Sequence, residues 1–489
     1  MPTLTAVHSA RVKHLVEAEP RAGGAYVLYW MQASQRTRFN HALEYAVGRA
    51  NGLGLPVLVG FGLTDDYPEA NARHYLFMLQ GLRDVAANLA KRGIGFVIRH
   101  GGPGDVAADL ARGAAVVVCD RGYLRHQKAW RAAVAGACER VGVPVTQVET
   151  DVVVPVDVAS NKREWAARTI RPKVHRHLTE FLVPLAQTKV KVAWTKSARG
   201  LKSDFDVSDP GRTLEKLKVD RSVAPVPQFF TGGENAVGVT VKSFFGRGST
   251  VKSERARLDG YAEGRNEPAA DRTSHVSAYL HFGHVSAVEL ALAARDSGAP
   301  AEDREAYLEE LIVRRELSVN YCEHTEHYDS YDALPGWAKQ TLKDHRADAR
   351  PHVYSLAELE SAGTADEYWN AAQREMVVTG FMHNYTRMYW GKKILEWTAD
   401  PREAFERTLY LNNKYFLCGR SPNAYASVAW IFGLHDRPWG PARPVFGTVR
   451  YMNAAGLDRR FDMPGYVARV SKQTSRYGRG GGPGGGGLS

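Results

Sequence analysis

The chain has 489 residues, of which 44% are hydrophobic and 24% charged; this composition excludes a disordered or fibrous chain, and the length exceeds what one core usually serves. The formal net charge of +11 favours a polyanionic partner, although a merely basic, solvated surface explains the charge equally well. No apolar run is long enough to cross a bilayer, which excludes a chain that spans membranes as helices.

The cysteines and the first residues of the chain indicate its compartment. Cys119, Cys138, Cys322 and Cys418 are widely spaced and include no Cys-x-x-Cys pair, which suits a reducing environment. Residues 1–20 lack the apolar stretch of a signal peptide. We therefore expect a cytoplasmic monomer with no membrane partner.

The first third of the chain alternates short β-branched runs with amphipathic stretches, after a segment, residues 1–24, that we expect to be flexible. Strands are predicted at residues 25–31, 55–63, 94–99, 114–120 and 143–148. Helices are predicted to begin near Arg36, Asn71, Gly104 and Leu124. This strict alternation predicts an α/β, Rossmann-like domain over residues 25–185, with a parallel sheet covered on both faces.

The turn after the first predicted strand has no dinucleotide-binding signature. It reads Gln32-Ala33-Ser34-Gln35 and contains no glycine that would let the backbone approach a pyrophosphate. Glycines at residues 101–104 are explained more simply as a turn. The fold therefore predicts a ligand crevice at the strand ends without naming the ligand, and a purely scaffolding role is equally consistent with it.

The second half of the chain has a different pattern. Residues 186–238 are rich in Lys, Pro, Gly and Ser and are interpreted as an interdomain linker. Residues 239–475 then predict an all-α domain, and residues 476–489, almost all glycine, a disordered tail. Helical periodicity is found at residues 251–261, 285–294, 306–321, 356–360, 366–378 and 383–397.

The last of these helices carries two apolar faces, so we expect it to be buried. Trp390, Ile394 and Trp397 share one face, a pattern that core packing alone would explain. His383 and Arg387 lie on the same helix, and a buried charge is costly unless a partner holds it. The sequence therefore predicts an anionic or polar partner for Arg387.

Three further clusters could carry chemistry. Residues 273–277, Thr-Ser-His-Val-Ser, predict a phosphate cradle at a helix start, unless their hydroxyls are only caps. Glu310 and Arg314 fall one turn apart on one helix, where a carboxylate facing a pocket would matter more than a surface ion pair. Residues 430–450 interleave tryptophans with arginines, as a nucleic-acid surface requires. Residues 322–327 lack a second ligand pair at zinc spacing, so we expect no metal site.

Taken together, these residues resemble class II DNA photolyases over nearly the whole chain, from Tyr29 to Met452. The most specific pieces are Ser277-x-Tyr279-Leu280-His281-Phe282-Gly283, Glu316-Leu317-Ser318-x-Asn320, Trp369-Asn370-Ala371-x-Gln373, Thr386-Arg387-Met388-Tyr389-Trp390 and His435-Asp436-Arg437. The resemblance implies an antenna-type α/β domain and a helical domain that binds FAD and DNA. It also implies light-driven repair of cyclobutane pyrimidine dimers.

In this family the reduced, anionic flavin passes an electron to a dimer flipped out of the duplex, and the cyclobutane ring opens. An antenna pigment such as 8-hydroxy-5-deazaflavin is optional, and no residue of the first domain demands one. The alternative within the fold is a cryptochrome-like blue-light sensor. Outside it, a generic basic DNA-binding protein explains the charge but not the buried tryptophans.

The resemblance also implies roles for individual residues. FAD would contact Tyr261, Thr273, Ser274, His275, Val276, Ser277, Arg387 and, at the flavin N5, Asn412. Catalysis would involve Glu310 beside the dimer and an electron relay of Trp390, Trp369 and Trp397. The lesion and its strand would contact Arg265, Asn266, Glu310, Arg314, Met388, Trp430, Arg437, Trp439 and Arg450.

One departure from the family concerns the partner of Arg387. The chain reads Cys418-Gly419-Arg420-Ser421 where the family usually has Asp-Gly-Arg-Asp, so the expected acid is a cysteine. Our hypothesis is that another carboxylate, or the negative flavin itself, neutralises Arg387.

Overall fold

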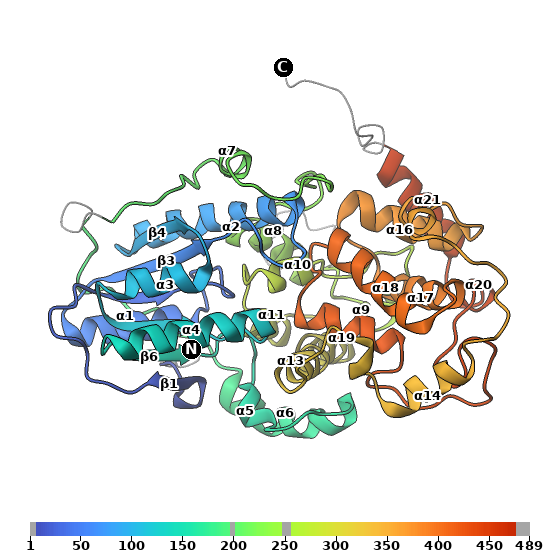
Figure 1. Ribbon diagram of the computed structural model, residues 1–489, viewed down its shortest axis with the longest axis horizontal. Helices are drawn as coiled ribbons and strands as arrows, with labels where there is room; N and C mark the ends of the chain where they lie inside the picture. Colours follow the sequence, from blue (N-terminus) through green and yellow to red (C-terminus); the bar gives the residue numbers. More distant parts are fainter. Residues whose placement is uncertain (1–5, 196–200, 247–255, 476–489) are drawn as a thin grey trace, which may run out of the picture.

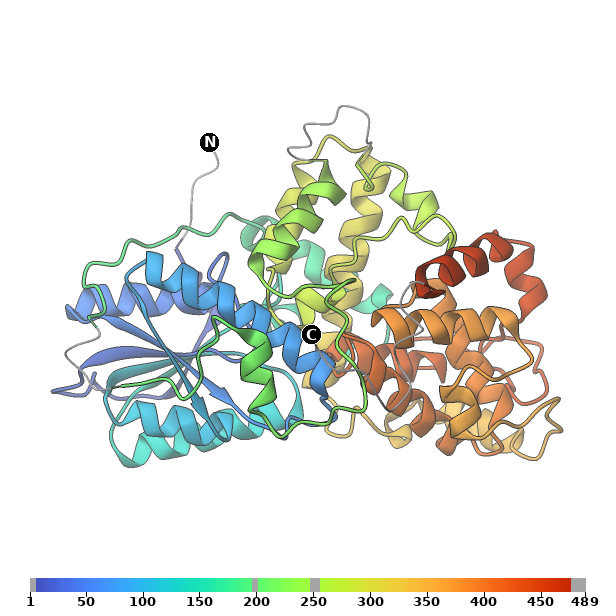
Figure 2. The ribbon, with the colours of Figure 1, turned by 90° about the horizontal axis from the view of Figure 1, so that it is seen from above.

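The computed structural model describes residues 6–195, 201–246 and 256–475, which form an α/β part and a helical part (Figure 1). Figure 2 shows the yellow-green helices, which precede residue 324, between the blue α/β part and most of the orange helices. The predicted fold class is confirmed. The predicted tail, residues 476–489, lies outside the described residues.

The sheet has six strands in the order β1-β6-β5-β2-β3-β4. They are β1 (Val12–Val16), β2 (Tyr26–Trp30), β3 (Val57–Leu63), β4 (Gly95–His100), β5 (Ala114–Asp120) and β6 (Val145–Val148). All neighbouring pairs are parallel except β1 with β6. Every residue of β2, β3 and β5 is buried, as expected for central strands of a sheet covered on both faces.

The five predicted strands are present, and β1 is an addition. It lies within the segment expected to be flexible, and it pairs antiparallel with β6 at the sheet edge. Lys13 and His14 on β1 are exposed, so the strand has none of the apolar pattern that identifies buried strands. Only its backbone pairing places it in the sheet.

Helices cover both faces of the sheet. One face packs against α1 (His41–Leu53) and the C-terminal half of α2 (Ala72–Lys91); the other packs against α3 (Pro103–Ala111) and α4 (Arg125–Arg140). The start of α2 was predicted from Asn71, whose side chain accepts a hydrogen bond from the Arg73 amide and so caps the helix. The α/β part ends with α5 (Val156–Ala159) and α6 (Ala167–Phe181).

The predicted linker is not a free tether where the structure describes it. It crosses the α/β part (green in Figure 1) and includes α7 (Pro210–Glu215). Leu214 and Leu217 bury against Leu79 and Leu82 of α2, which holds this part of the connection on the domain. The linker prediction missed this packing because the apolar residues are scattered among Lys, Pro and Ser.

The helical part carries most of the remaining secondary structure. Its helices are α8 (Glu234–Phe245), α9 (Tyr261–Gly264), α10 (Ser277–His281), α11 (Ala287–Arg295), α12 (Ala301–Leu308), η3 (Glu309–Arg314), α13 (Arg315–Glu323), α14 (Gly336–Asp344), α15 (Leu356–Glu360), α16 (Glu367–Thr379), α17 (Asn384–Trp397), α18 (Pro401–Tyr415), α19 (Pro422–Ile431), α20 (Ala454–Asp458) and α21 (Met463–Ser475). Short 3-10 turns occur at η1 (Ser9–Arg11) and η4 (Tyr331–Ala333). No helix among these described residues has both the length and the apolar character needed to cross a bilayer.

Two predicted helices differ from the structure. The periodicity at residues 306–321 does not form one α-helix, because η3 inserts a π-helical segment between α12 and α13. Residues 256–260 form turns before α9, while residues 251–255 lie outside the described part. The buried helix α17 has the predicted apolar faces: Trp390 and Ile394 pack in one core and Leu395 in another.

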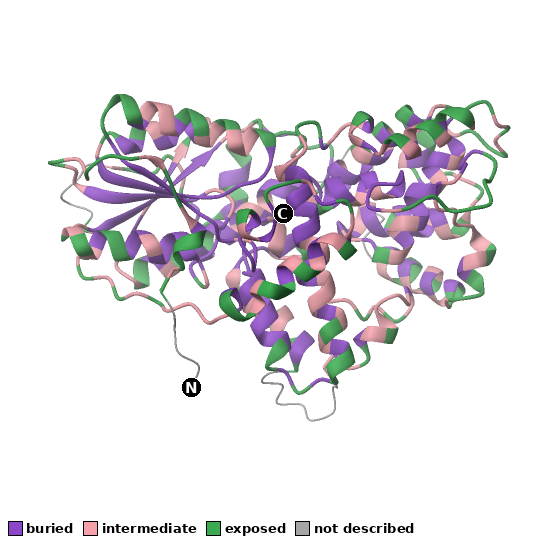
Figure 3. Ribbon diagram, turned by 90° about the horizontal axis from the view of Figure 1, so that it is seen from below, coloured by how far each residue is buried: buried purple, intermediate pink, exposed green. Residues whose placement is uncertain are grey.

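The two parts are joined by buried hydrogen bonds. Arg36 pairs with Asp151 at 2.9 Å and donates to the carbonyl of Gly283, which lies on the helical side. Gly283 has φ of 69°, and a Cβ there would lie 2.1 Å from the carbonyl oxygen of Ala33. Only glycine allows this close approach of the two backbones. Figure 3 shows buried residues continuing from the sheet into the central helices.

Candidate functional site

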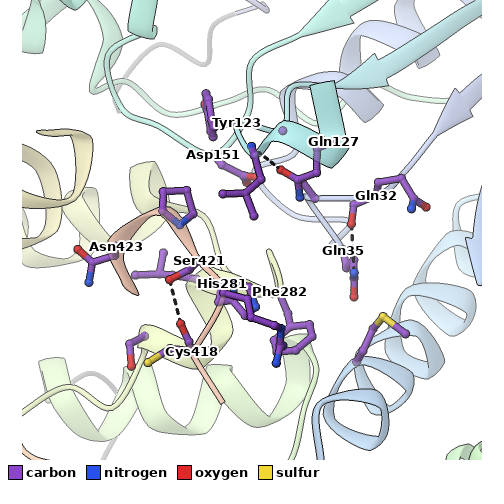
Figure 4. Close-up of a pocket in the computed structure, with 18 of the residues that line it drawn as sticks. Gln32, Gln35, Tyr123, Gln127, Asp151, His281, Phe282, Cys418, Ser421 and Asn423 are labelled. Atoms are coloured by element: carbon purple, nitrogen blue, oxygen red, sulfur yellow. Dashed lines mark hydrogen bonds between the residues drawn. The ribbon is translucent and has the colours of Figure 1, made fainter. Parts of the chain in front are cut away.

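A cavity of about 310 Å³ lies between the α/β part and the helical part, at the carboxyl ends of β2, β3 and β5 (Figure 4). The chain leaves β2 toward β3 on one side and later returns to β5 on the other, so the cavity sits at a topological switch point. The α/β side contributes Gln32, Gln35, Thr64, Tyr67, Tyr123 and Gln127, among others.

The turn after β2 is shaped by Asp120 at the end of β5. Its carboxylate accepts hydrogen bonds from the amides of Gln32, Ala33 and Ser34 at 3.2, 3.3 and 2.9 Å. Burial raises the pKa of Asp120, and these three donors oppose the rise. The carboxylate therefore occupies the amides that a dinucleotide-binding turn would offer to a pyrophosphate.

The helical wall contains several of the residues predicted to bind FAD or the lesion. Those that line the cavity are Tyr261, Ser274, Val276, Ser277, Glu310 and Arg314. The N-cap position of α10 is Val276, which has no side-chain oxygen, so the hydroxyls of this segment are not its caps. Nearby, the Tyr307 hydroxyl is buried without a hydrogen-bond partner, and burial raises the pKa of Tyr307.

Thr273 and His275 turn away from the cavity. The Thr273 hydroxyl donates to Asp271 at 3.3 Å, and His275 pairs with the same carboxylate at 2.8 Å. The pKa of Asp271 is lowered despite its burial because His275 holds the carboxylate. Only part of the predicted cradle is therefore presented to the cavity.

Glu310 lies on the π-helical segment η3, and its carboxylate is 2.7 Å from the Arg265 guanidinium. The structure does not form the i, i+4 pair of Glu310 with Arg314. Instead Arg314 pairs with Glu309 at 3.0 Å, because the π-helical geometry changes which residues share a face. Glu310 is therefore left facing the cavity and Arg265.

The predicted lesion-binding residues fall into two groups. Arg314 lies 5.5 Å above the Trp430 ring, next to the cavity. Arg437 and Arg450 stack on the two-fifths-exposed Trp439, at 5.5 and 5.4 Å. This second group forms a surface stack and does not line the cavity. Asn266 and Met388 are half-buried and are also absent from the cavity lining.

Arg387 lies beside the predicted position of its partner. Its guanidinium donates to the Cys418 thiol at 3.6 Å and stacks on the Phe416 ring at 3.7 Å. Among the described residues no carboxylate comes within 4.0 Å of Arg387. Cys418 lines the cavity, whereas Asn412 is buried behind it and donates to Asn413 at 2.9 Å.

The three tryptophans predicted to relay electrons belong to one core. The Trp369 and Trp397 rings are 5.5 Å apart, and the Trp369 indole N–H donates to the Trp390 carbonyl at 2.9 Å. The Trp390 ring lies 6.5 Å from Phe416, which carries Arg387 on its face. Ordinary core packing explains these contacts, and the link between Trp369 and Trp390 is a hydrogen bond to the backbone and not a ring contact.

Some residues at the cavity were not singled out from the sequence. Arg420 is 2% exposed, lines the cavity with φ of 63° and has an Nε without a partner. Tyr123 reaches the same space from the loop after β5, and Gln127 reaches it from the first turn of α4. These residues come together only because separate segments of the chain meet in the folded protein, and no local sequence pattern predicts such a contact.

A deep cavity at a switch point between an α/β part and a helical part is typical of a protein that holds a large ligand. Residues 27–191 match the DNA photolyase family. A deoxyribodipyrimidine photo-lyase of Methanothermobacter thermautotrophicus is 48% identical over 95% of this chain and 98% of its own length. One from Oryza sativa subsp. japonica is 39% identical over 95% of this chain and 90% of its own.

Solved structures show the same fold at low identity. A bacterial class III photolyase from Agrobacterium tumefaciens superposes with a TM-score of 0.69 at 19% identity, covering 93% of this chain and 88% of its own. A Synechocystis cryptochrome superposes with a TM-score of 0.65 at 15% identity, covering 92% and 89%. With the full-length relatives, these matches show that the chain belongs to the DNA photolyase family.

Proposed function

We propose that the protein repairs cyclobutane pyrimidine dimers in DNA by light-driven electron transfer, as a class II enzyme. The observation that carries the proposal is Glu310, a carboxylate on a π-helical segment that faces the same cavity as Tyr261, Ser274 and Ser277. Relatives named deoxyribodipyrimidine photo-lyase, which this chain covers over 98% and 90% of their own lengths, support this activity. The protein is proposed to act as a cytoplasmic monomer.

The residues present fit FAD. Hydroxyls of Ser274 and Ser277 and the unpartnered buried atoms of Tyr307 and Arg420 face a cavity of about 310 Å³, so polar groups await a polar ligand. When bound and reduced, the flavin would supply, on excitation by light, the electron that is transferred to the dimer. Tyr261, Ser274, Val276, Ser277 and Arg387 are proposed to hold it, with Asn412 at its N5.

The chain's own side chains would position the lesion. Glu310 offers a carboxylate acceptor to a pyrimidine N–H, and Arg265 holds that carboxylate at 2.7 Å. Trp430, with Arg314 on its face, offers a flat surface for an unstacked base. The surface stack of Arg437, Trp439 and Arg450 would hold the strand around the lesion.

The α/β side of the cavity is proposed as the place of an antenna pigment. Tyr67, Tyr123 and Gln127 provide aromatic faces and one amide there, which suit a flat molecule. An 8-hydroxy-5-deazaflavin is proposed from the family resemblance, and repair without an antenna is equally compatible with these residues.

The test is direct illumination of the reduced protein with DNA that contains thymine dimers, following the return of thymine absorbance. We expect recovery with the wild type, much slower recovery with Glu310→Ala, and unchanged recovery with Glu263→Ala, an exposed carboxylate on α9. If a yellow, photoreducible wild type gives no recovery, repair is refuted and a cryptochrome-like sensor takes its place.

A further inference from the structure

An exposed tryptophan lies outside the proposed lesion site, on the loop between α5 and α6. Trp165 is 60% exposed, and the Arg163 guanidinium stacks on its ring at 4.8 Å. An exposed ring with a cation stacked on it is the kind of surface on which the bases of a nucleic acid can stack. Neither Trp165 nor Arg163 is among the residues assigned above to the flavin or to the lesion.

The loop that presents Trp165 is held firmly. The Asn320 side chain donates to the Lys162 carbonyl at 2.9 Å and accepts from the Glu164 amide at 2.7 Å. Arg163 donates to the Ala333 carbonyl at 3.1 Å. These bonds fix the backbone immediately before Trp165, so its exposure is a built feature of the loop.

Trp165 is also connected to the lesion site. Its carbonyl oxygen accepts a hydrogen bond from Nδ1 of His435 at 3.0 Å, and the His435 ring lies 5.8 Å from Trp430. Burial lowers the pKa of His435 to about 4, so the ring is neutral and its Nδ1 carries the donated proton. Trp165 and Trp430 therefore contact the same imidazole from opposite parts of the chain.

The adjoining helix α6 presents a basic face. Residues 162–177 contain six Lys or Arg residues and one acidic residue, Glu164. Arg168, His175 and Arg176 share one face and are exposed. Among the described residues, no carboxylate lies within 4.0 Å of Arg168 or Arg176, so both cations are available.

The helix α6 is tied to the cavity wall through an ion pair. Arg171 of α6 binds Glu309 through two hydrogen bonds, at 3.0 and 2.7 Å. Glu309 also pairs with Arg314 and precedes Glu310 in the chain, so α6 is anchored to the segment that carries the proposed catalytic carboxylate. A strand that enters the lesion site from this side would pass over Trp165 and α6.

We infer that Trp165 and the exposed cations of α6 form a second DNA-binding surface, which grips the duplex next to the extruded dimer. This inference rests on the proposed function. Arg168 and Arg176 bind backbone phosphates of the flanking duplex, and Trp165 packs on a nucleoside at the edge of the lesion. The surface therefore adds affinity for duplex DNA without touching the dimer.

The experiment compares binding of a dimer-containing duplex by wild type, Arg168→Glu/Arg176→Glu and Trp165→Ala over a range of salt concentrations. The affinity of the double variant should be about tenfold lower or more. The slope of log affinity against log salt concentration should fall by about two, because two phosphate contacts are lost. Trp165→Ala should weaken binding at every salt concentration without changing that slope, and Trp165→Phe should restore most of it. Arg140→Glu, on the exposed end of α4, is the matched control.

A second substrate separates this inference from the proposed function. Repair of a dimer in a very short single strand, which has no flanking nucleoside that reaches Trp165 or α6, should match the wild type in all these variants and show that they are folded. The inference is overturned if the double variant binds duplex with the slope of Arg140→Glu, or if the short strand loses repair in parallel with the duplex. If the wild type repairs neither substrate, the proposed function fails instead.

Discussion

The guanidinium of Arg387 donates to the thiol of Cys418 across 3.6 Å, at the position where the family resemblance led us to expect an acid. Phe416 covers the other side of that guanidinium, and no described carboxylate reaches it within 4.0 Å. Of the two partners considered from the sequence, another carboxylate is therefore not found among the described residues. The positive charge of Arg387 remains for a negative ligand to neutralise.

Replacing Cys418 with Asp should lower the reduction potential of the bound flavin. The new carboxylate would pair with Arg387 and cancel a charge that favours the anionic, reduced ligand. Two unit charges about 10 Å apart at an effective dielectric constant of about 20 interact by roughly 1 to 2 kcal/mol, equivalent to about 20 to 40 mV for two electrons. A spectroelectrochemical titration measures this shift. Cys418→Ser is the neutral control, and equal potentials for both variants would disprove the idea.

Trp369→Phe should impair light-driven reduction of the flavin while leaving chemically reduced protein able to repair. The substitution removes the ring that lies 5.5 Å from Trp397 and the N–H that binds the Trp390 carbonyl. It should also cost about 1 to 3 kcal/mol of unfolding free energy, because a buried carbonyl loses its donor. Photoreduction kinetics and denaturant unfolding test both effects. Trp194→Phe, in the α/β part, should leave photoreduction at the wild-type rate.

Lys392→Met should stabilise the fold near neutral pH. Lys392 on α17 is 1% exposed and donates to the Ile431 carbonyl, and burial lowers its pKa to about 7; the charge of Asp436 opposes the shift and that of Arg450 adds to it. The unfolded chain therefore binds this proton more tightly, and the wild type gains stability as pH rises from about 7 to about 10.5.

The variant should lack that gain, which is on the order of a few kcal/mol. The measurement is the free energy of unfolding at several pH values, taken as the difference between wild type and variant so that other titrating groups cancel. Lys343→Met, at an exposed position of α14, should keep the wild-type profile. Parallel profiles for wild type and Lys392→Met would contradict the assignment.

Asn320→Ala should loosen the loop that carries Trp165. The amide binds the backbone of Lys162 and Glu164, so its loss leaves the buried Glu164 N–H without a partner, while the Lys162 carbonyl keeps the Ser160 hydroxyl. The expected cost is about 1 to 3 kcal/mol of unfolding free energy. Denaturant titration measures it, with the exposed Asn161→Ala as control. Duplex binding should fall in the Asn320 variant alone, and equal affinities would mean that the loop does not need this clamp.

The sequence predicted the elements whose pattern is local. Central strands such as β5 and the start of α2 at Asn71 follow from β-branched runs and capping chemistry. The π-helical turn of η3 could not be predicted, because residues 306–321 have ordinary helical periodicity and the insertion changes only which side chains share a face. Strand β1 was missed because an edge strand needs no apolar alternation.

The candidate site was predictable only in part. Tyr261, Ser274, Ser277 and Glu310 follow from the family resemblance of the sequence, and all four line one cavity. The contact of Trp165 with His435 joins residues 270 positions apart, and only the folded arrangement of the two parts brings them together.

The hydrogen bonds between Asp120 and the turn after β2 restrict which ligands the α/β part can bind. Three consecutive amides are hydrogen-bonded to Asp120, so a pigment bound at these strand ends would contact aromatic rings and side-chain amides instead. A phosphate group on such a pigment would be repelled by the Asp120 carboxylate. This side of the cavity should therefore bind flat pigments whose polar tails point to solvent. The two sides of the cavity would then differ in the charge of the ligand that each binds. Nucleotides would bind on the helical side and neutral chromophores on the side of the sheet.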